Sequence, residues 1–270
     1  MYKLLATDLD DTLLNENWKI GERDKNLIRK ARQQGLKVII ATGRMFRAAV
    51  GYAEELELEL PLITYQGALI KNRLTGEIIK QYPLPNALAL QIVEAIRPWG
   101  YHLHMYHNDE LIVAAKNEQV ISYEKMSRCQ AQEVGDLGQY LQRTGLNPIK
   151  ILVAEEESKL DAILPLLREQ FKEHLHIAKS KSFYLEFSHP LAHKGQALAD
   201  LAAALGFKPE EVIAVGDGFN DWEMLKWAGL GAAVANAQAE IKAMADYVAE
   251  ASNQEGAVGE VIEKFVLGMS

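Results

Sequence analysis

Two aspartates, Asp8 and Asp10, stand one residue apart at the end of an apolar N-terminal run. In an extended chain alternate side chains share a face, so the two carboxylates would begin on the same side of a strand. Like charges this close repel each other and raise at least one pKa unless a cation or a proton separates them. Because folding alone gives little reason to build such a pair, it indicates chemistry or a metal site.

Four segments of the sequence carry polar residues directly after a predicted strand or at the start of a predicted helix. They are 8–12, 42–44, 193–195 and 216–221. The carboxyl ends of parallel strands meet at one edge of a sheet, so these segments can converge there if the sheet is parallel. Asp8 and Asp217 would then supply hard oxygen ligands, and Asp221 or Asn220 would add another. Such ligands suit Mg²⁺ rather than zinc or copper.

The same edge would present groups that bind phosphate. Lys194 contributes one compact positive charge, Thr42 a hydroxyl and Gly43 an open backbone amide. Together with a magnesium ion these groups make a phosphate site. A carboxylate beside such a site is a competent nucleophile toward phosphorus.

The elements that must position these residues follow from the hydrophobic pattern. In the first third of the chain, apolar runs predict strands at 4–9, 36–41 and 62–65, and amphipathic stretches predict helices at 22–34 and 46–56. This alternation predicts a parallel sheet with helices on both faces. The same pattern returns after Lys194.

The middle of the chain has a different texture. Residues 68–82 predict a hairpin, and the Pro-rich stretch 83–86 marks a boundary. Beyond it, strands and helices are mixed as in an α+β unit with an antiparallel sheet. We therefore predict the α/β class, with a Rossmann-like, doubly wound core formed by 1–83 and 189–270. A second domain at 84–188 is inserted on the rim that carries the acidic pair, so it could act as a lid.

Composition excludes several classes of function. The formal net charge is −8, and no basic cluster is interleaved with aromatic residues, so we expect no nucleic-acid partner. No apolar run reaches the roughly 18 residues that a membrane-spanning helix needs, and the first strand begins too early for a signal peptide. We expect a cytoplasmic monomer or small homo-oligomer. The single cysteine, Cys129, rules out an intramolecular disulfide.

The four segments, taken in order, resemble the motifs of the haloacid dehalogenase superfamily of phosphatases, in the Cof-like branch with a large α/β cap. Asp-Leu-Asp-Asp-Thr-Leu (8–13) resembles the first motif, Ala-Thr-Gly-Arg (41–44) the second, His-Lys-Gly (193–195) the third and Gly-Asp-Gly-Phe-Asn-Asp (216–221) the fourth. Further matches to that branch are Asn236-Ala237, Lys242, Ala245-Asp246 and 253–256. The resemblance covers essentially the whole chain.

This resemblance implies a role for each residue. Asp8 would attack phosphorus and carry the phosphoryl group, and Asp10 would protonate the leaving oxygen and later activate water. The resemblance assigns phosphate or substrate binding to Thr42, Gly43, Arg44, Lys194 and Asn220, and metal binding to Asp8, Asp10, Asp217 and Asp221. Asp10 would bind the metal through its backbone carbonyl. Arg44 either touches the substrate or binds a carboxylate of the scaffold.

Two details depart from the family pattern. Gln66 stands where relatives often carry Asn before Gly, and His189 and His193 flank the third motif, where other residues are common. Both bear on contacts with the substrate rather than on the core chemistry. A cluster of three histidines, His102, His104 and His107, has no acidic partner at ligand spacing, so we interpret them as ordinary strand residues rather than a metal site, with contact to the substrate as the lesser alternative.

The leading hypothesis is a Mg²⁺-dependent phosphomonoester hydrolase that acts on a small phosphorylated metabolite, such as a sugar phosphate, a nucleotide or a phosphorylated cofactor. The resemblance implies that it works through an aspartyl-phosphate. One alternative is a phosphomutase, which would return the phosphoryl group to another hydroxyl of the same sugar. The other alternative is a catalytically inactive regulatory protein that binds a phosphorylated ligand.

Overall fold

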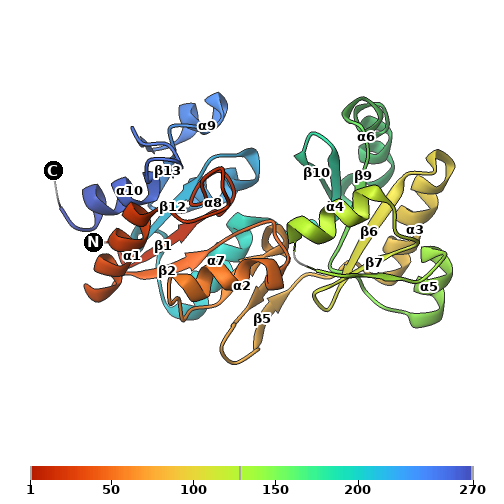
Figure 1. Cartoon of the computed structure of the whole chain (residues 1–270), viewed down its shortest axis with the longest axis horizontal. Coiled ribbons are helices and arrows are strands. Elements are labelled where there is room, and N and C mark those ends of the chain that lie inside the picture. Colours follow the sequence, from red (N-terminus) through yellow and green to blue (C-terminus); the bar gives the residue numbers. More distant parts are fainter. Residues whose placement is uncertain (1, 128, 269–270) are drawn as a thin grey trace. The chain divides into compact units, whose positions relative to one another are not determined.

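The computed structural model describes residues 2–127 and 129–268, and the chain divides into two compact units (Figure 1). The core unit comprises Met1–Gly43, Ala49–Lys80 and His193–Ser270, and the inserted unit comprises Arg44–Ala48 and Gln81–Ala192. The segment 84–188, expected from the sequence to form the second domain, lies inside the inserted unit. That unit also includes the short segment 44–48.

A five-stranded parallel sheet forms the centre of the core unit, with the strand order β14-β13-β12-β1-β2. Its strands are β1 (Leu4–Thr7), β2 (Lys37–Ile40), β12 (Val212–Gly216), β13 (Leu230–Ala233) and β14 (Tyr247–Val248). The three central strands are buried on both faces, as their continuous apolar runs predict. The predicted α/β class with a parallel sheet is confirmed.

Helices cover both faces of this sheet. The chain runs from β1 to β2 toward one edge and from β12 through β13 to β14 toward the other edge. Since parallel crossovers are right-handed, the helices that follow β1 and β12 lie on opposite faces. The helices of this pattern are α1 (Glu22–Gln33), α2 (Phe46–Glu55), α7 (Lys194–Leu205), α8 (Trp222–Trp227), α9 (Ala239–Met244) and α10 (Ala257–Phe265). Helix α1 packs on α10, and α7 packs on α8.

The third strand of the expected parallel series belongs to another sheet. β3 (Leu62–Thr64) pairs antiparallel with β4 (Leu69–Lys71), and β5 (Ile78–Gln81) completes a three-stranded sheet. A single parallel bridge, Ala41 to Ile63, joins β3 to the end of β2. The tight turn after β3 reverses the chain and thereby supplies an antiparallel partner, which the hydrophobic pattern alone did not predict.

The inserted unit is built on a six-stranded sheet with the order β10-β11-β9-β6-β7-β8, antiparallel except for the pair β7-β8. Its strands are β6 (His102–His107), β7 (Glu110–Val113), β8 (Ala131–Glu133), β9 (Lys150–Ala154), β10 (His176–Lys181) and β11 (Tyr184–Ser188). Its helices are α3 (Asn86–Ile96), α4 (Glu118–Ser127), α5 (Leu137–Thr144) and α6 (Glu157–Phe171). Residues of α3, α5 and α6 pack on one face of the sheet in a single apolar cluster.

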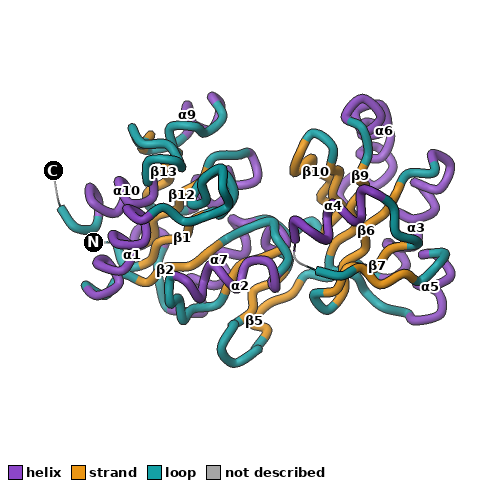
Figure 2. The backbone as a smooth tube through the Cα atoms, in the orientation of Figure 1, coloured by secondary structure: helices purple, strands orange, loops and turns teal. Residues whose placement is uncertain are grey.

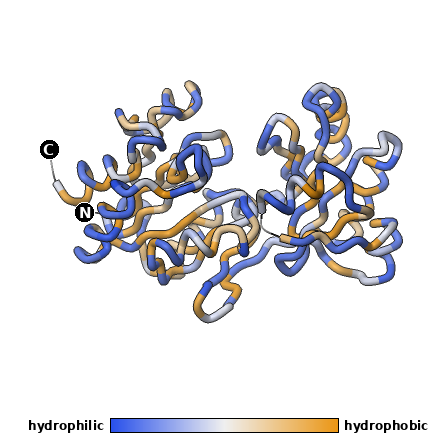
Figure 3. Tube along the Cα trace, in the orientation of Figure 1, coloured by the Kyte–Doolittle hydropathy of each residue, from blue (hydrophilic) through white to orange (hydrophobic). Residues whose placement is uncertain are grey.

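Secondary structure and hydropathy agree closely along both units (Figures 2 and 3). Hydrophobic residues gather in the strands, while the connecting loops are largely hydrophilic. Single 3₁₀ turns punctuate the loops: η1 (Tyr65–Gly67), η2 (Arg97–Trp99), η3 (Lys172–His174), η4 (Pro209–Glu211) and η5 (Phe219–Asp221). Within the described ranges, none of the helices has the length and apolar content needed to cross a bilayer.

Candidate active site

The candidate site lies where β1 and β12 run side by side. The connections after these two strands lead to opposite edges of the sheet, and a crevice at the carboxyl ends of the strands is expected at such a point. Asp8 follows β1, and its backbone N–H donates to the carbonyl of Val215 at 3.0 Å, which extends the strand pairing by one residue. Asp217 follows β12. The sheet therefore brings Asp8 and Asp217 together although they are 209 positions apart in the sequence.

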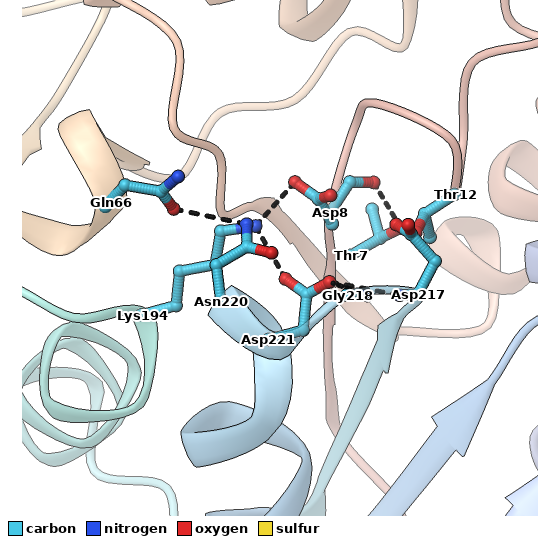
Figure 4. Close-up of polar contacts among 9 residues, drawn as sticks. All are labelled: Thr7, Asp8, Thr12, Gln66, Lys194, Asp217, Gly218, Asn220 and Asp221. Carbon is cyan, nitrogen blue, oxygen red and sulfur yellow. Dashed lines mark hydrogen bonds and ion pairs between the residues drawn. The ribbon is translucent and has the colours of Figure 1, made fainter. Parts of the chain in front are cut away.

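A buried lysine joins two of the carboxylates. Lys194, the first residue of α7, places its Nζ 2.7 Å from Oδ1 of Asp8 and 2.6 Å from Oδ1 of Asp221 (Figure 4). Lys194 and Asp221 are fully buried, and Asp8 is only 4% exposed. A buried charge is costly unless it is paired, and here one cation serves two anions. The arrangement therefore holds Asp8 in a fixed position.

Asp221 also organises the loop after β12. Its Oδ2 accepts hydrogen bonds from the backbone N–H groups of Asp217, at 3.0 Å, and Gly218, at 3.1 Å. Both carboxylate oxygens of Asp221 are thus engaged, one by Lys194 and the other by the loop. A Cβ at Gly216 would lie 2.5 Å from the Cβ of Asp221, so the loop can close on Asp221 only with glycine there.

The third carboxylate, that of Asp217, completes an acidic group. One carboxylate oxygen from each of Asp8, Asp217 and Asp221 lies within 4.8 Å of the others, the one such group found among the described residues. The hydroxyl of Thr12 donates to Oδ1 of Asp217 at 2.6 Å. This bond links the loop after β1 to the loop after β12.

Burial and mutual repulsion disfavour the negative charges of this group. Burial raises the pKa of Asp8 well above its usual range; Lys194 opposes that rise, while Asp221 and Asp217 add to it. Burial, and next the charge of Asp221, raise the pKa of Asp217 to about 7, against the lowering effect of the Thr12 hydrogen bond. Burial alone would lower the pKa of Lys194, but its two carboxylate partners outweigh burial and raise it.

The residues present fit a divalent cation. Three carboxylates lie close together with one lysine among them, and the pKa values of Asp8 and Asp217 are raised by burial first and by the neighbouring carboxylates next. A hard cation bound between Asp8 and Asp217 would relieve that repulsion, and all the available donors are oxygens. This donor set matches a hard divalent cation.

The second motif lies beside the turn that follows β3. Thr42 is fully buried, its N–H donates to the carbonyl of Ile63 at 2.9 Å, and its carbonyl accepts from the N–H of Gln66 at 3.1 Å. A Cβ on Gly43 would collide with the amide group of Gln66. The Oε1 of Gln66 accepts from Nδ2 of Asn220 at 3.3 Å. Gln66 thus connects the second motif to the fourth.

The backbone at this turn is strained. Tyr65, Gln66 and Gly67 have φ values of 53°, 58° and 98°, three consecutive residues in the left-handed region. A tyrosine in that region is uncommon, and such strain is concentrated at functional sites in proteins. A Cβ on Gly67 would strike the backbone carbonyl of His193, so the turn packs directly against the start of α7.

Other residues singled out from the sequence do not belong to the carboxylate cluster. Asp10 is half-buried in the loop after Asp8. Arg44 belongs to the segment 44–48 of the inserted unit and not to the core unit that carries the carboxylates. The histidines of β6 in the inserted unit belong to no metal-ligand group among the residues that the structure describes.

Two further residues contribute to the site in ways that the sequence does not predict. Thr12 belongs to the first motif, and its hydroxyl donates to Asp217. Gln66 departs from the family pattern, and its side chain lies between Gly43 and Asn220. The Gln-Gly pair directly after an apolar strand was the available signal for a left-handed turn.

Comparison with known proteins places this geometry in a family. Residues 5–262 match the family of haloacid dehalogenase-like hydrolases. Over 265 residues the chain is 31% identical to the 5-amino-6-(5-phospho-D-ribitylamino)uracil phosphatase YcsE of Bacillus subtilis, covering 98% of this chain and 96% of that protein. Over 278 residues it is 28% identical to the phosphatase YwpJ of the same organism, covering 94% and 96%.

A solved structure agrees with these matches. The crystal structure of a haloacid dehalogenase-like hydrolase from Bacteroides thetaiotaomicron superimposes with a TM-score of 0.88 at 29% identity, covering 98% of this chain and 99% of that chain. The resemblance drawn from the four motifs is therefore confirmed. The chain belongs to the haloacid dehalogenase-like hydrolases, and it is a phosphatase, an enzyme that hydrolyses phosphate esters.

Proposed function

We propose that this phosphatase is a Mg²⁺-dependent phosphomonoesterase that acts on a small phosphorylated metabolite through an aspartyl-phosphate on Asp8. The observation that carries this proposal is the placement of Asp8 at the carboxyl end of β1. There its Oδ1 is held by buried Lys194, and carboxylate oxygens of Asp8 and Asp217 lie within 4.8 Å of each other, so that the two could share a cation. A carboxylate fixed in this way is suited to attack phosphorus.

The reaction would proceed in two displacements. In the first, Oδ2 of Asp8 forms a bond to phosphorus while the bond from phosphorus to the ester oxygen breaks, and Asp10 gives its proton to the leaving alkoxide. In the second, Asp10 takes a proton from water as the water oxygen bonds to phosphorus. The bond from Asp8 to phosphorus then breaks, releasing inorganic phosphate. General acid–base assistance of this kind is worth roughly 10²–10⁴-fold in rate.

The chain's own groups would stabilise the charge that develops on the transferring phosphoryl group. Lys194 carries a full positive charge in a buried position, and the Gly43 amide and Thr42 hydroxyl would donate to the equatorial oxygens. Preorganised donors of this kind supply much of the catalysis in phosphoryl transfer.

Mg²⁺ would be held by Asp8, Asp217 and the backbone carbonyl of Asp10, and when bound it would neutralise phosphoryl charge and orient the group. Asp221 would support the metal site indirectly, since both its oxygens already accept hydrogen bonds from Lys194 and the loop. Asn220 and Arg44 would contact the phosphate or the substrate.

The substrate class rests on the relatives. The YcsE protein is named for a phosphorylated ribitylaminouracil, a small soluble metabolite. We propose a substrate of that general size, with the inserted unit acting as the cap that reads the leaving group and excludes water. The net charge of −8 supports a small ligand rather than a nucleic acid.

The test is phosphate release from a panel of phosphorylated metabolites and para-nitrophenyl phosphate, with and without Mg²⁺. Wild-type protein should release phosphate only with the metal. The rate of phosphate release by Asp8→Asn should be lower by a factor of at least about 1,000. Asp161→Asn, on the exposed surface of α6, is the matched control and should retain activity.

The outcomes distinguish the alternatives. Full Mg²⁺-dependent turnover in Asp8→Asn would rule out the assigned nucleophile. An isomeric sugar phosphate without free phosphate would identify a phosphomutase, and binding without turnover of any ester would identify a regulatory protein.

A further inference from the structure

The loop between the catalytic aspartates and α1 is held by its own turn and also by side chains from distant segments. Within the turn, the N–H groups of Thr12, Leu13 and Leu14 donate to the carbonyl of Leu9, at 3.4, 3.0 and 2.8 Å. Asp11 has φ 58°, in the left-handed region, and its side chain is exposed. A residue keeps such a conformation where the surrounding structure holds it. Part of that support comes from distant segments.

Two asparagines hold the carbonyls on either side of Thr12 and Leu13. Nδ2 of Asn236 donates to the carbonyl of Asp11 at 2.7 Å, and Nδ2 of Asn253 donates to the carbonyl of Leu14 at 2.8 Å. The asparagines are themselves joined, because the N–H of Asn253 donates to Oδ1 of Asn236 at 2.9 Å. The bond from Asn253 to the carbonyl of Leu14 is buried, and Asn253 is only 6% exposed.

The segment 234–238, which carries Asn236, also binds the other acidic loop. The N–H of Gln238 donates to the carbonyl of Asp217 at 3.0 Å, and the N–H of Val234 donates to the carbonyl of Gly216 at 3.3 Å. Lys242 supports the segment by donating from Nζ to the carbonyl of Ala235 at 2.9 Å. One short segment therefore contacts the loop after β1 and the loop after β12.

We propose that Asn236 and Asn253 are positioning residues that set the direction of Asp10 and the contact of Thr12 with Asp217. This inference rests on the proposed function, in which Asp10 is the general acid. Asp10 lies between Asp8, which β1 and Lys194 fix, and Asp11, which Asn236 fixes. The turn bonds to Leu9 remain when the Asp11 carbonyl is released, but the restraint nearest to Asp10 is lost. The Asp10 carboxyl is then oriented less precisely.

The consequence depends on the leaving group. An alkoxide is expelled only if it receives a proton, whereas para-nitrophenolate departs without one. Misorientation of the Asp10 carboxyl group should therefore slow cleavage of an alkyl phosphate more than cleavage of para-nitrophenyl phosphate. A general loosening of the fold, or of Asp8, would slow both esters alike.

The experiment measures kcat/KM for both esters in wild type, Asn236→Ala and Asn253→Ala. This parameter covers only the steps up to the first phosphoryl transfer, so hydrolysis of the intermediate does not obscure it. We expect kcat/KM for the alkyl ester to fall about 10- to 100-fold and that for the aryl ester to fall at most about threefold. The double variant should lose little more than either single variant, because the two residues act as one unit.

Asn236→Ala keeps the test valid if buried Asn253 is needed for folding, since Asn236 is exposed. Asn72→Ala is the control: Asn72 caps a turn in the same unit, accepting from the N–H groups of Leu74 and Thr75, and the variant should match wild type with both esters. Equal losses with both esters, or no loss in Asn236→Ala, would overturn the positioning role and leave the proposed function intact. If wild type hydrolyses neither ester, the proposed function fails and this inference fails with it.

Discussion

Asp217 carries its carboxylate in an environment that disfavours the negative charge. Burial and the neighbouring Asp221 raise its pKa from 3.8 to about 7. In the unfolded chain the same group loses its proton near its usual value, so the folded state binds the proton more tightly. The stability contributed by this group is present below pH 3.8 and is lost as the pH rises through 7. Asp217 thus costs stability at the pH at which the enzyme would work.

We therefore expect Asp217→Asn to stabilise the metal-free protein. The amide removes the charge and keeps an oxygen for the Thr12 hydroxyl. Its free energy of unfolding should exceed that of wild type by on the order of 1 kcal/mol above pH 7 and match it near pH 4. The same variant should lose at least about 100-fold in activity. Urea unfolding at both pH values checks the first expectation, and an equal difference at both would contradict the electrostatic explanation.

The turn at Tyr65–Gly67 shows how one position can constrain two motifs. Gly67→Ala should reduce activity because its Cβ would push the carbonyl of His193 and so displace Lys194. Gly76→Ala is a matched control, since Gly76 also has positive φ, +74°, but no atom of the part of the chain that the structure describes lies within 4 Å of its Cβ position. Both variants should lose roughly 1–3 kcal/mol of stability through backbone strain. Only Gly67→Ala should lose activity, and equal loss in both would refute the contact.

Helices α1 and α10 are joined by a buried carboxyl group. Oδ1 of Asp24 accepts from the N–H of Gly259 at 2.7 Å, in the first turn of α10, while its Oδ2 is buried and has no hydrogen-bond partner among the described residues. Burial raises the pKa of Asp24 from 3.8 to about 6, and the Gly259 bond opposes that rise. The folded state therefore favours protonated Asp24, and this contribution is lost as the pH rises from 4 through 6.

Asp24→Asn should remove this pH dependence. The amide oxygen can still accept from Gly259, so the thermal midpoint of the variant should rise relative to wild type between pH 4 and pH 7. The corresponding change in the free energy of unfolding is up to about 3 kcal/mol, which is equivalent to the rise of about two units in the pKa of Asp24. Asp161→Asn serves as the exposed control and should show no such trend. A constant difference between Asp24→Asn and wild type across this range would contradict the assignment.

Most elements could be predicted because their apolar runs have the length and period of buried strands or amphipathic helices. β8 and α5 are short and contain few apolar residues, although Asp136 and Gly145 bracket α5 as its N-cap and C-cap and offer a usable signal. β3 lies parallel to the end of β2 through the single bridge from Ala41 to Ile63, but its ladder is with β4, because strand partners depend on the turn that follows and not on hydrophobicity.

The carboxylates and Lys194 could be predicted because each follows a strand or opens a helix, and parallel topology brings such positions together. The contacts of Thr12 with Asp217 and of Gln66 with Asn220 join residues 205 and 154 positions apart. Nothing in the local sequence specifies such partners. Only the fold does.

The two units differ in what they contribute to the chemistry. All three clustered carboxylates and Lys194 belong to the core unit, so binding of a cation should stabilise that unit. At a Mg²⁺ concentration about 100 times the dissociation constant, linkage predicts a gain of about 2.7 kcal/mol, or roughly 5 °C in the midpoint of the core unit. Calorimetry with and without Mg²⁺ measures this shift.

Asp217→Asn should lack the Mg²⁺-dependent shift, while Asp161→Asn in the inserted unit should retain it. The cation would have to bind elsewhere if the thermal midpoints of the wild type do not change with Mg²⁺. The same would follow if Asp217→Asn still shows the Mg²⁺-dependent shift.

Asn253 reaches back 239 positions to hold the carbonyl of Leu14. During translation the catalytic loop is therefore synthesised before any of the residues that hold it. Lys194, Asp217 and Asp221 follow, and Asn253 comes after all three. Until those later segments leave the exit tunnel, the nascent chain has its first motif in solvent with no partners for its aspartates. We expect that a ribosome-bound chain has no phosphatase activity until the segment that carries Asn253 has left the exit tunnel.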